Sequence, residues 1–416
     1  MSEIVIVSIF VLGYLFIILE HKIHLNKAAS AILTGAILWC ILGATVGTSA
    51  THHLNEYIGD VAGIIFFMLG ALTIVEIVDY HKGFDTIFYR VKEMKKIPLM
   101  WFMCWLTFFL SSILDNLTTA IVMVAMLKDI PMNKKADKLT IAGMVIIASN
   151  AGGAWTPIGD ITTTMLWIAN RITTGVIMQE LFIPCVISLL VPLLIAGLFF
   201  FKENEVIQVY RGEGKPSKKS QLILLAGISL LIAVPLFKAF FHLTPSLAMI
   251  LSAGLMWVIV EVFLRDKATK ENLVFHILKR IDYTTLYFFI GILLAVSALK
   301  EAGTLQQMAT FFSESTSNFY IFSGIMGVIS AIVDNIPLLA ATIKMYSLEQ
   351  YPTNHPLWVS LAFTTGYGGN MLIIGSAAGV AVMNLIGIDF MWYFRRISGL
   401  AVIGYVVGLA LIMLLA

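Results

Sequence analysis

Long apolar runs without a charged residue recur from one end of the chain to the other. Many of them reach the length with which a helix crosses a bilayer, about 20 residues. Charged residues make up only 12% of the 416 residues and hydrophobic ones 59%, with a mean hydropathy of +0.91. A soluble globular domain carries about 25% charged residues, so this chain would leave a soluble fold with too little polar surface. The sequence therefore predicts an all-α polytopic membrane protein.

Ten of these runs are predicted to be full transmembrane spans, the first of them a retained helix and not a cleaved signal. They cover about 4–19, 28–46, 58–78, 139–170, 178–201, 220–241, 246–264, 283–299, 357–388 and 397–416. Two further apolar segments, 98–128 and 318–344, are each interrupted in the middle by an Asp-Asn pair.

The positive charges sort the loops into two sides. Of the 27 Lys and Arg residues, 23 lie in six loops, which the positive-inside rule places in the cytoplasm. These loops are 20–27, 79–97, 128–138, 202–219, 265–282 and 389–396. The alternation works only if segments 98–128 and 318–344 each return to the side from which they entered. Both are therefore predicted to be re-entrant hairpins with the Asp-Asn pair at the tip, and both chain termini lie on the outer, periplasmic side.

The chain divides into two halves of the same plan, each with five spans, one hairpin and one broken helix. The first inverted repeat is 1–201 (hairpin about 98–128, broken helix about 139–170), 202–219 is a cytoplasmic linker, and the second repeat is 220–416 (hairpin about 318–344, broken helix about 357–388). Because five is odd, the second half runs upside down relative to the first. Inverted repeats are a recurrent plan of secondary transporters, whose sites lie near the midplane between broken helices.

The segment 150–160, NAGGAWTPIGD, interrupts an otherwise continuous span, and GGAWTPIGD within it aligns with GGNMLIIGS at 368–376. Gly-Gly and Pro release backbone groups from the helix ladder, and such groups are tolerated in a membrane only against protein or a water-filled cavity. Carbonyl, hydroxyl and carboxylate oxygens suit a small hard cation such as sodium. Burial favours the protonated carboxyl once the cation leaves, so one Asp can bind either a cation or a proton.

The candidate ion- and proton-binding residues lie at the two tips and in the two breaks. They are Asp115, Asn116, Thr118, Asn150, Thr156, Asp160, Thr163, Asp334, Asn335 and Asn370, of which Asp115, Asn116, Asn150 and Asp160 are predicted to hold sodium. Plainer roles stay open for several of them. Each Asp can simply cap the helix that follows it, and the Thr hydroxyls can bond back to their own helix.

Three motifs resemble those of the NhaD-type sodium/proton antiporters of the ion transporter superfamily: DNLTT at 115–119, SNAGGAWTPIGDITT at 149–163 and DNIP at 334–337. The resemblance covers nearly the whole chain. It implies exchange of sodium or lithium for protons in a bacterial inner membrane, a homodimer, and an elevator-like motion of the hairpins and broken helices. Related dicarboxylate carriers have Ser-Asn-Thr at the tips, whereas the Asp residues here would repel an anionic substrate. Because the second tip lacks the Thr pair and Ser376 stands at the place of Asp160, Asp115 with Asp160 is the predicted primary site.

The sequence thus predicts a secondary antiporter that exchanges cytoplasmic sodium or lithium for external protons by alternating access. Its partners are the transported ions and the lipid bilayer, with no resident cofactor, no enzymatic activity and no nucleic acid. A sodium-coupled symporter or an arsenite-type exporter on the same fold is the first alternative. An intramembrane aspartyl protease is a distant one, because PIGD at 157–160 does not match the GxGD pattern of that class.

Overall fold

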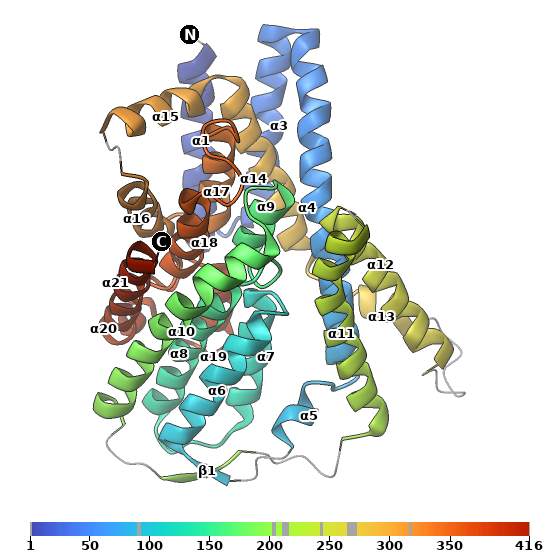
Figure 1. Cartoon of the computed structure of the whole chain (residues 1–416), viewed down its shortest axis with the longest axis vertical. Helices are drawn as coiled ribbons and strands as arrows, with labels where there is room; N and C mark the ends of the chain where they lie inside the picture. The colour runs from blue at the N-terminus through green and yellow to red at the C-terminus, as the bar shows by residue number, and fades with distance from the viewer. Residues whose placement is uncertain are drawn as a thin grey trace.

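The computed structural model describes residues 2–89, 93–201, 205–209, 216–241, 244–263, 273–315 and 318–415, and most of them are helical (Figure 1). The first half contains α1 (Ser2–Ile18), α2 (Glu20–Ile23), α3 (Lys27–Val46), α4 (Thr48–Tyr80), α5 (Asp85–Phe88), α6 (Lys96–Ser111), α7 (Asn116–Asp129), α8 (Lys135–Gly153), α9 (Ile161–Ile168) and α10 (Thr174–Phe199). The second half contains α11 (Lys218–Phe241), α12 (Pro245–Val258), the π-helical turn η1 (Ile259–Phe263), α13 (Leu273–Leu278), α14 (Tyr283–Glu301), α15 (Thr304–Ser315), α16 (Phe319–Ser330), α17 (Asn335–Met345), α18 (Pro356–Gly368), α19 (Ala377–Ile386), α20 (Phe390–Arg396) and α21 (Ser398–Leu415). Two short strands, β1 (Glu93–Lys95) and β2 (Val206–Gln208), pair antiparallel.

Seven helices within the described ranges are long and apolar enough to cross a membrane. They are α3, α4, α10, α11, α12 with most of η1, α14 and α21. The pair α19 and α20, bent by 114°, would make an eighth span if counted as one. The prediction of a polytopic helical membrane protein is confirmed, whereas the finer predictions of ten spans and two inverted repeats stay predictions. Several helix ends differ from the sequence estimate by a few residues, and α4 differs more, since it begins at Thr48, ahead of the expected start at 58.

Four interruptions of the helices coincide with the irregular segments expected from the sequence. The chain leaves helical geometry at 112–115 and 331–334, where each Asp-Asn pair lies, and at 154–160 and 369–376, which follow the Gly-Gly pairs. Each interruption is flanked by a helix on both sides, so the polar residues of these segments are held between helix ends. In Figure 1, α6, α7, α8 and α19 gather in one part of the molecule, and α1, α3 and α14 in another, near the N-terminus.

An equivalent close contact between two helices occurs once in each half of the chain. A Cβ added to Gly152 in α8 would overlap the carbonyl oxygen of Phe108 in α6, and a Cβ added to Gly368 in α18 would overlap the carbonyl oxygen of Gly327 in α16. Glycine is required at both places because the backbones approach too closely for any side chain. Small residues play this part in membrane helix packing generally.

The two halves also share an equivalent hydrogen bond, made by the serine hydroxyl at the last residue of α6 and of α16. Ser111 Oγ donates to the carbonyl oxygen of Ser149 at 2.6 Å, and Ser330 Oγ donates to that of Thr365 at 2.7 Å. All four residues are buried. Each helix that precedes an Asp-Asn pair is thus fastened to the helix that precedes a Gly-Gly break.

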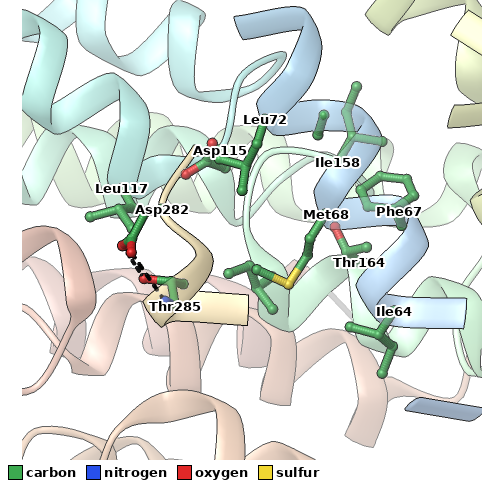
Figure 2. Close-up of a pocket in the computed structure, with 12 residues that line it drawn as sticks. Ile64, Phe67, Met68, Leu72, Asp115, Leu117, Ile158, Thr164, Asp282 and Thr285 are labelled. Carbon is green, nitrogen blue, oxygen red and sulfur yellow. Dashed lines mark hydrogen bonds between the residues drawn. The ribbon is translucent and has the colours of Figure 1, made fainter. Parts of the chain in front are cut away.

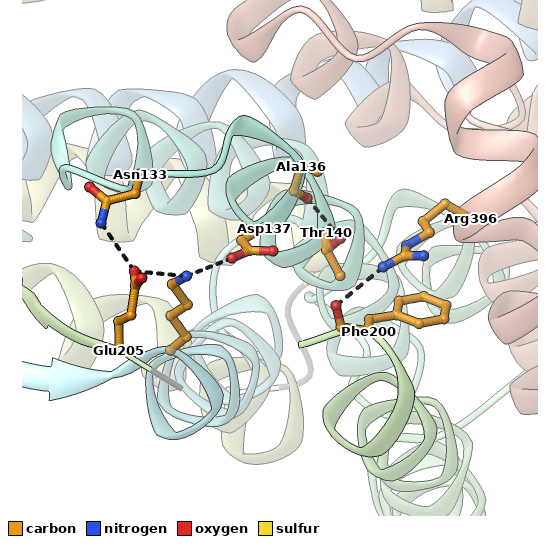
Figure 3. Close-up of polar contacts among 8 residues, drawn as sticks. Asn133, Ala136, Asp137, Thr140, Phe200, Glu205 and Arg396 are labelled. Atoms are coloured by element: carbon orange, nitrogen blue, oxygen red, sulfur yellow. Dashed lines mark hydrogen bonds and ion pairs between the residues drawn. The ribbon is translucent and has the colours of Figure 1, made fainter. Parts of the chain in front are cut away.

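A buried lysine fastens the segment between the halves to the start of α6 (Figure 3). Lys96 Nζ lies 2.8 Å from Asp137 Oδ2 and 3.0 Å from Glu205 Oε2, and Asn133 Nδ2 donates to the same Glu205 oxygen at 3.2 Å. Desolvation lowers the pKa of Lys96, but its hydrogen bonds to the two carboxylates outweigh that effect and leave the pKa above its usual value. Lys96 therefore stays cationic and joins the starts of α6 and α8 to Glu205, the residue before β2.

The glycine contact leads to a test of packing. We expect Gly152→Ala to destabilise the protein by about 1–3 kcal/mol, because the added methyl group forces α6 away from α8. Gly254→Ala in α12 is the matched control, since its methyl group would meet nothing within 4 Å. The measurement is the midpoint of thermal unfolding of both purified variants in detergent. Equal midpoints for the two would show that α6 and α8 do not pack as described.

Candidate functional site

Each of the four helices that follow an interruption begins at a side chain that caps it. Asp115 accepts hydrogen bonds from the backbone N–H of Thr118 at 2.8 Å and from its hydroxyl at 2.5 Å. Asp160 Oδ1 accepts from the N–H of Thr162 at 2.9 Å. Asp334 caps α17 through the N–H of Ile336 at 3.4 Å, and Ser376 caps α19 through that of Gly379 at 3.1 Å. The capping role left open for these Asp residues is therefore real.

Capping leaves part of each carboxylate free for other partners. An ionised carboxylate has about four acceptor positions on two oxygens, and a cap uses one or two of them. The positive end of a helix dipole also favours a negative charge at its N-terminus. The caps therefore position the carboxyl groups of Asp115 and Asp160 without excluding a cation.

A buried chain of side-chain amides joins the first Asp-Asn pair to both Gly-Gly breaks. Asn116 Nδ2 donates to Asn150 Oδ1 and to Asp160 Oδ2, both at 2.8 Å. Asn150 Nδ2 in turn donates to Asn370 Oδ1 at 2.6 Å and lies 3.3 Å from Ser376 Oγ. These five residues, which we call the amide network, connect positions 220 apart in the sequence.

The amide network is shielded from solvent. Asn150 and Asn370 are 0% exposed, Asp160 is 1% exposed and Asn116 is 6% exposed. Within the described part of the chain, Asn370 Nδ2 and the hydroxyl oxygen of Thr162 beside Asp160 are buried and have no hydrogen-bond partner. Buried polar atoms without partners cost stability. These two atoms could therefore interact with a group that is not part of the described chain.

The predicted threonines support the irregular backbone around the network. Thr156 Oγ1 donates to the carbonyl oxygen of Ser112 at 2.6 Å, and Thr163 Oγ1 donates to that of Asp160 at 2.8 Å. Thr118 donates to Asp115, as described above. A hydroxyl oxygen that donates its proton still has lone pairs to offer, so the plainer role of these residues is present beside any role as ligands.

The second Asp-Asn pair is not joined to the amide network. The backbone N–H of Asp334 donates to the Tyr14 hydroxyl at 3.1 Å, and Asn335 is buried. Among the described residues, neither side chain makes a hydrogen bond to a member of the network. The contacts of the two Asp-Asn pairs therefore differ, in line with the difference that the sequence suggested.

Two residues of the site were not among the predicted ligands. Ser376 occupies the position of Asp160 in the aligned breaks, and this alignment was the signal that could have identified it. Tyr393, in α20, donates its hydroxyl proton to the carbonyl oxygen of Asn370 at 2.9 Å. It lies in a segment expected to be a charged loop, so no sequence signal pointed to it.

Asp115 also lines a cavity (Figure 2). The walls of this cavity come from α4, α7, the end of the first Gly-Gly break, α9 and the start of α14. Most of its lining is apolar, and its polar residues are Asp115, Thr164, Asp282 and Thr285. The carboxylate of Asp115, which precedes Asn116 of the network in the chain, therefore borders an open space.

The chain is similar to several known transport proteins. The family model described as "Citrate transporter" matches residues 14–366. Sodium/proton antiporter 1 of Arabidopsis thaliana is 42% identical over 98% of this chain and 72% of its own length, and sodium/proton antiporter 2 of the same plant is 39% identical over 96% and 97%. The Na(+)/H(+) antiporter NhaD of Alkalimonas amylolytica is 30% identical over 91% and 83%. The chain belongs to the NhaD-type antiporter family.

Membership of the NhaD-type family makes the chain a transporter and not an enzyme. The recognition of the family from its three motifs is thereby confirmed, and the aspartyl protease alternative falls. The relatives come from plants as well as from bacteria, so placement in a bacterial inner membrane stays a prediction, as do the orientation of the termini and the homodimer.

The amide network leads to a second test of structure. We expect Asn116→Leu, which keeps the branched skeleton of the side chain but removes its polar atoms, to destabilise the protein by about 1–3 kcal/mol because two buried acceptors lose their donor. Asn133→Leu is the control, since Asn133 is exposed and donates to the carboxylate of Glu205 outside the network. Thermal unfolding in detergent measures both variants. A loss for Asn116→Leu no larger than for the control would contradict the network.

Proposed function

We propose that this NhaD-type antiporter exchanges sodium or lithium for protons at a site formed by Asp160, Asp115, Asn116 and Asn150. One observation carries the proposal: the carboxylate of Asp160 is buried among amides that join one Asp-Asn pair to two broken helices. The names of the relatives support the same ions.

The exchange of a proton for a cation follows from the uncompensated negative charge of the two carboxylates. Within the described residues, neither Asp115 nor Asp160 forms an ion pair with a Lys, Arg or His. An uncompensated Asp in the middle of a membrane costs at least about 2.5–3.5 kcal/mol, so the carboxyl group is neutralised either by a proton or by a bound cation. A sodium ion can enter only as the proton leaves, and this competition is what couples the two fluxes.

The neighbouring oxygens suit a dehydrated alkali cation. The Asp160 carboxylate and the Asn150 side-chain oxygen both accept from the Asn116 amide nitrogen, and the buried Thr162 hydroxyl beside the carboxylate has no hydrogen-bond partner among the described residues. Oxygen ligands of this kind are those that hard cations prefer. Under this proposal the ion is the substrate, and no resident cofactor takes part.

Alternating access is supported by the internal correspondence of the two halves. The Gly152 and Gly368 contacts, and the Ser111 and Ser330 hydrogen bonds, relate α6 with α8 to α16 with α18. Inverted repeats with substrate at their interface commonly work by moving one bundle against another. We propose that both Asp-Asn segments are re-entrant hairpins, that the positively charged loops are cytoplasmic, and that sodium leaves the cytoplasm.

A second candidate function comes from the description of the matching family model, which names citrate. Citrate is an anion with several carboxylates, and two uncompensated Asp side chains at the site would repel it. Sodium-coupled transport of a solute is therefore the alternative outcome of the experiment rather than the proposal.

The direct test uses everted membrane vesicles from cells that lack their own sodium/proton antiporters. With a respiratory proton gradient in place, sodium, lithium and then citrate are added while a pH-sensitive dye reports the lumen. The proposal predicts recovery of the dye signal with sodium or lithium alone. No recovery with either ion, with the protein present in the membrane, would overturn it and favour solute transport.

Asp160→Asn tests the central residue in the same vesicles. Asparagine can make similar hydrogen bonds but cannot exchange a proton for a cation, so we expect exchange to fall below detection while the protein still inserts. Asp389→Asn is the matched control, because Asp389 is an exposed cap of α20 that accepts from the Trp392 N–H at 3.0 Å. Exchange by Asp160→Asn at the level of the control would remove Asp160 from the mechanism.

A further inference from the structure

The cavity that reaches Asp115 has a second carboxylate in its wall (Figure 2). This is Asp282, the residue that caps the N-terminus of α14. Asp282 is exposed, whereas Asp115 is only partly exposed. Among the described residues that line the cavity, these two are the only charged ones, and apolar side chains of α4 such as Phe67 and Met68 form much of the remaining wall. The cavity therefore leads from an accessible carboxylate to the tip carboxylate.

Asp282 and Asp115 are held in the same way. Asp282 Oδ1 accepts from the backbone N–H groups of Thr284 and Thr285 at 3.0 and 3.2 Å, and its Oδ2 accepts from the Thr285 hydroxyl at 2.5 Å. This repeats the pairing of Asp115 with Thr118. Both side chains are thus fixed against the wall of the cavity rather than free to swing away from it.

No positive charge in the described part of the chain compensates Asp282. Arg280, two residues earlier, is engaged elsewhere: its guanidinium lies 2.8 Å from Asp79 Oδ2 and 3.4 Å from Glu76 Oε2. The negative charge of Asp282 is therefore available to an ion that approaches the cavity.

A second cavity beside α4 contains a positively charged side chain, unlike the first. It meets the first at Ile64 and is lined by Asp60 and Lys344, whose carboxylate and amine lie 3.4 Å apart. The Lys344 amine also lies over the ring of Tyr57, 4.4 Å from its centre. None of the predicted ion-binding residues lines this cavity. A cation entering there would meet a lysine, so the route open to Asp115 is the cavity that contains Asp282.

We propose that Asp282 attracts sodium or lithium into the cavity from the side where α14 begins, and so sets the apparent affinity for the cation without belonging to the binding site itself. The inference rests on the proposed cation exchange. A fixed charge at the mouth of a cleft with low-dielectric walls focuses the field and raises the local concentration of counter-ions. The plainer alternative is that Asp282 only caps α14.

The test compares Asp282→Asn with Asp389→Asn, which removes the charge of another exposed capping Asp that lines neither cavity. Exchange is measured in everted vesicles as a function of sodium concentration, at low ionic strength and again with choline chloride added. For Asp282→Asn we expect the half-maximal sodium concentration to rise by about threefold or more with the maximal rate retained. Added salt shrinks this difference because it screens the charge. Asp282→Glu, which keeps both charge and cap, is expected to restore the wild-type value.

Three results would overturn the inference. An unchanged half-maximal concentration in Asp282→Asn, or a shift equal to that of Asp389→Asn, would leave Asp282 as a cap only. A lower maximal rate and a lower amount of protein in both Asp282→Asn and Asp282→Glu would show a structural role. In each case exchange by the wild-type protein would leave the proposed function standing. Absence of sodium- or lithium-driven exchange in the wild type would instead overturn the proposed function, and the inference with it.

Discussion

The carboxylate of Asp160 is buried in the protein with an amide partner, and no positively charged side chain of the described segments lies beside it. Its Oδ2 accepts from Asn116, its Oδ1 accepts from the start of α9, and the side chain is 1% exposed. In such surroundings a lone negative charge is expensive, and hydrogen bonds from neutral donors only partly offset the cost. The group therefore needs a proton or a cation, and the proposed exchange depends on that need.

Much of the nearby structure serves to hold this carboxylate in place. The Gly-Gly pair ends α8, the cap at Asp160 starts α9, and the glycine at 152 lets α6 lie against the break. Asn116 of the first Asp-Asn pair and Asn370 of the second break supply the amides from opposite halves of the chain. Moving any of these elements would change the positions of the polar groups around Asp160. Under the proposed function, a conformational change of this kind would alter the affinity of the site for ions.

The sequence identified the parts of the site better than their connections. Gly-Gly, Pro and Asp-Asn break helices by known rules, so the irregular segments could be predicted, with Asp160, Asn116, Asn150 and Asn370 as their candidate residues. The hydrogen bond between Asn150 and Asn370 could not, because it depends on how two distant segments pack. Thr48, the start of α4, was missed for a different reason: a polar first turn conceals the beginning of the helix.

The central claim, that a cation and a proton compete for one buried carboxyl group, is tested most directly by calorimetric titration of purified protein with sodium chloride. Repeating the titration in buffers of different ionisation enthalpy counts the protons released, with choline chloride as control. The account predicts up to about one proton released per sodium ion bound, an apparent affinity that weakens as pH falls, and loss of both in Asp160→Asn. Sodium binding without proton release at every pH from about 5 to 9 would contradict it.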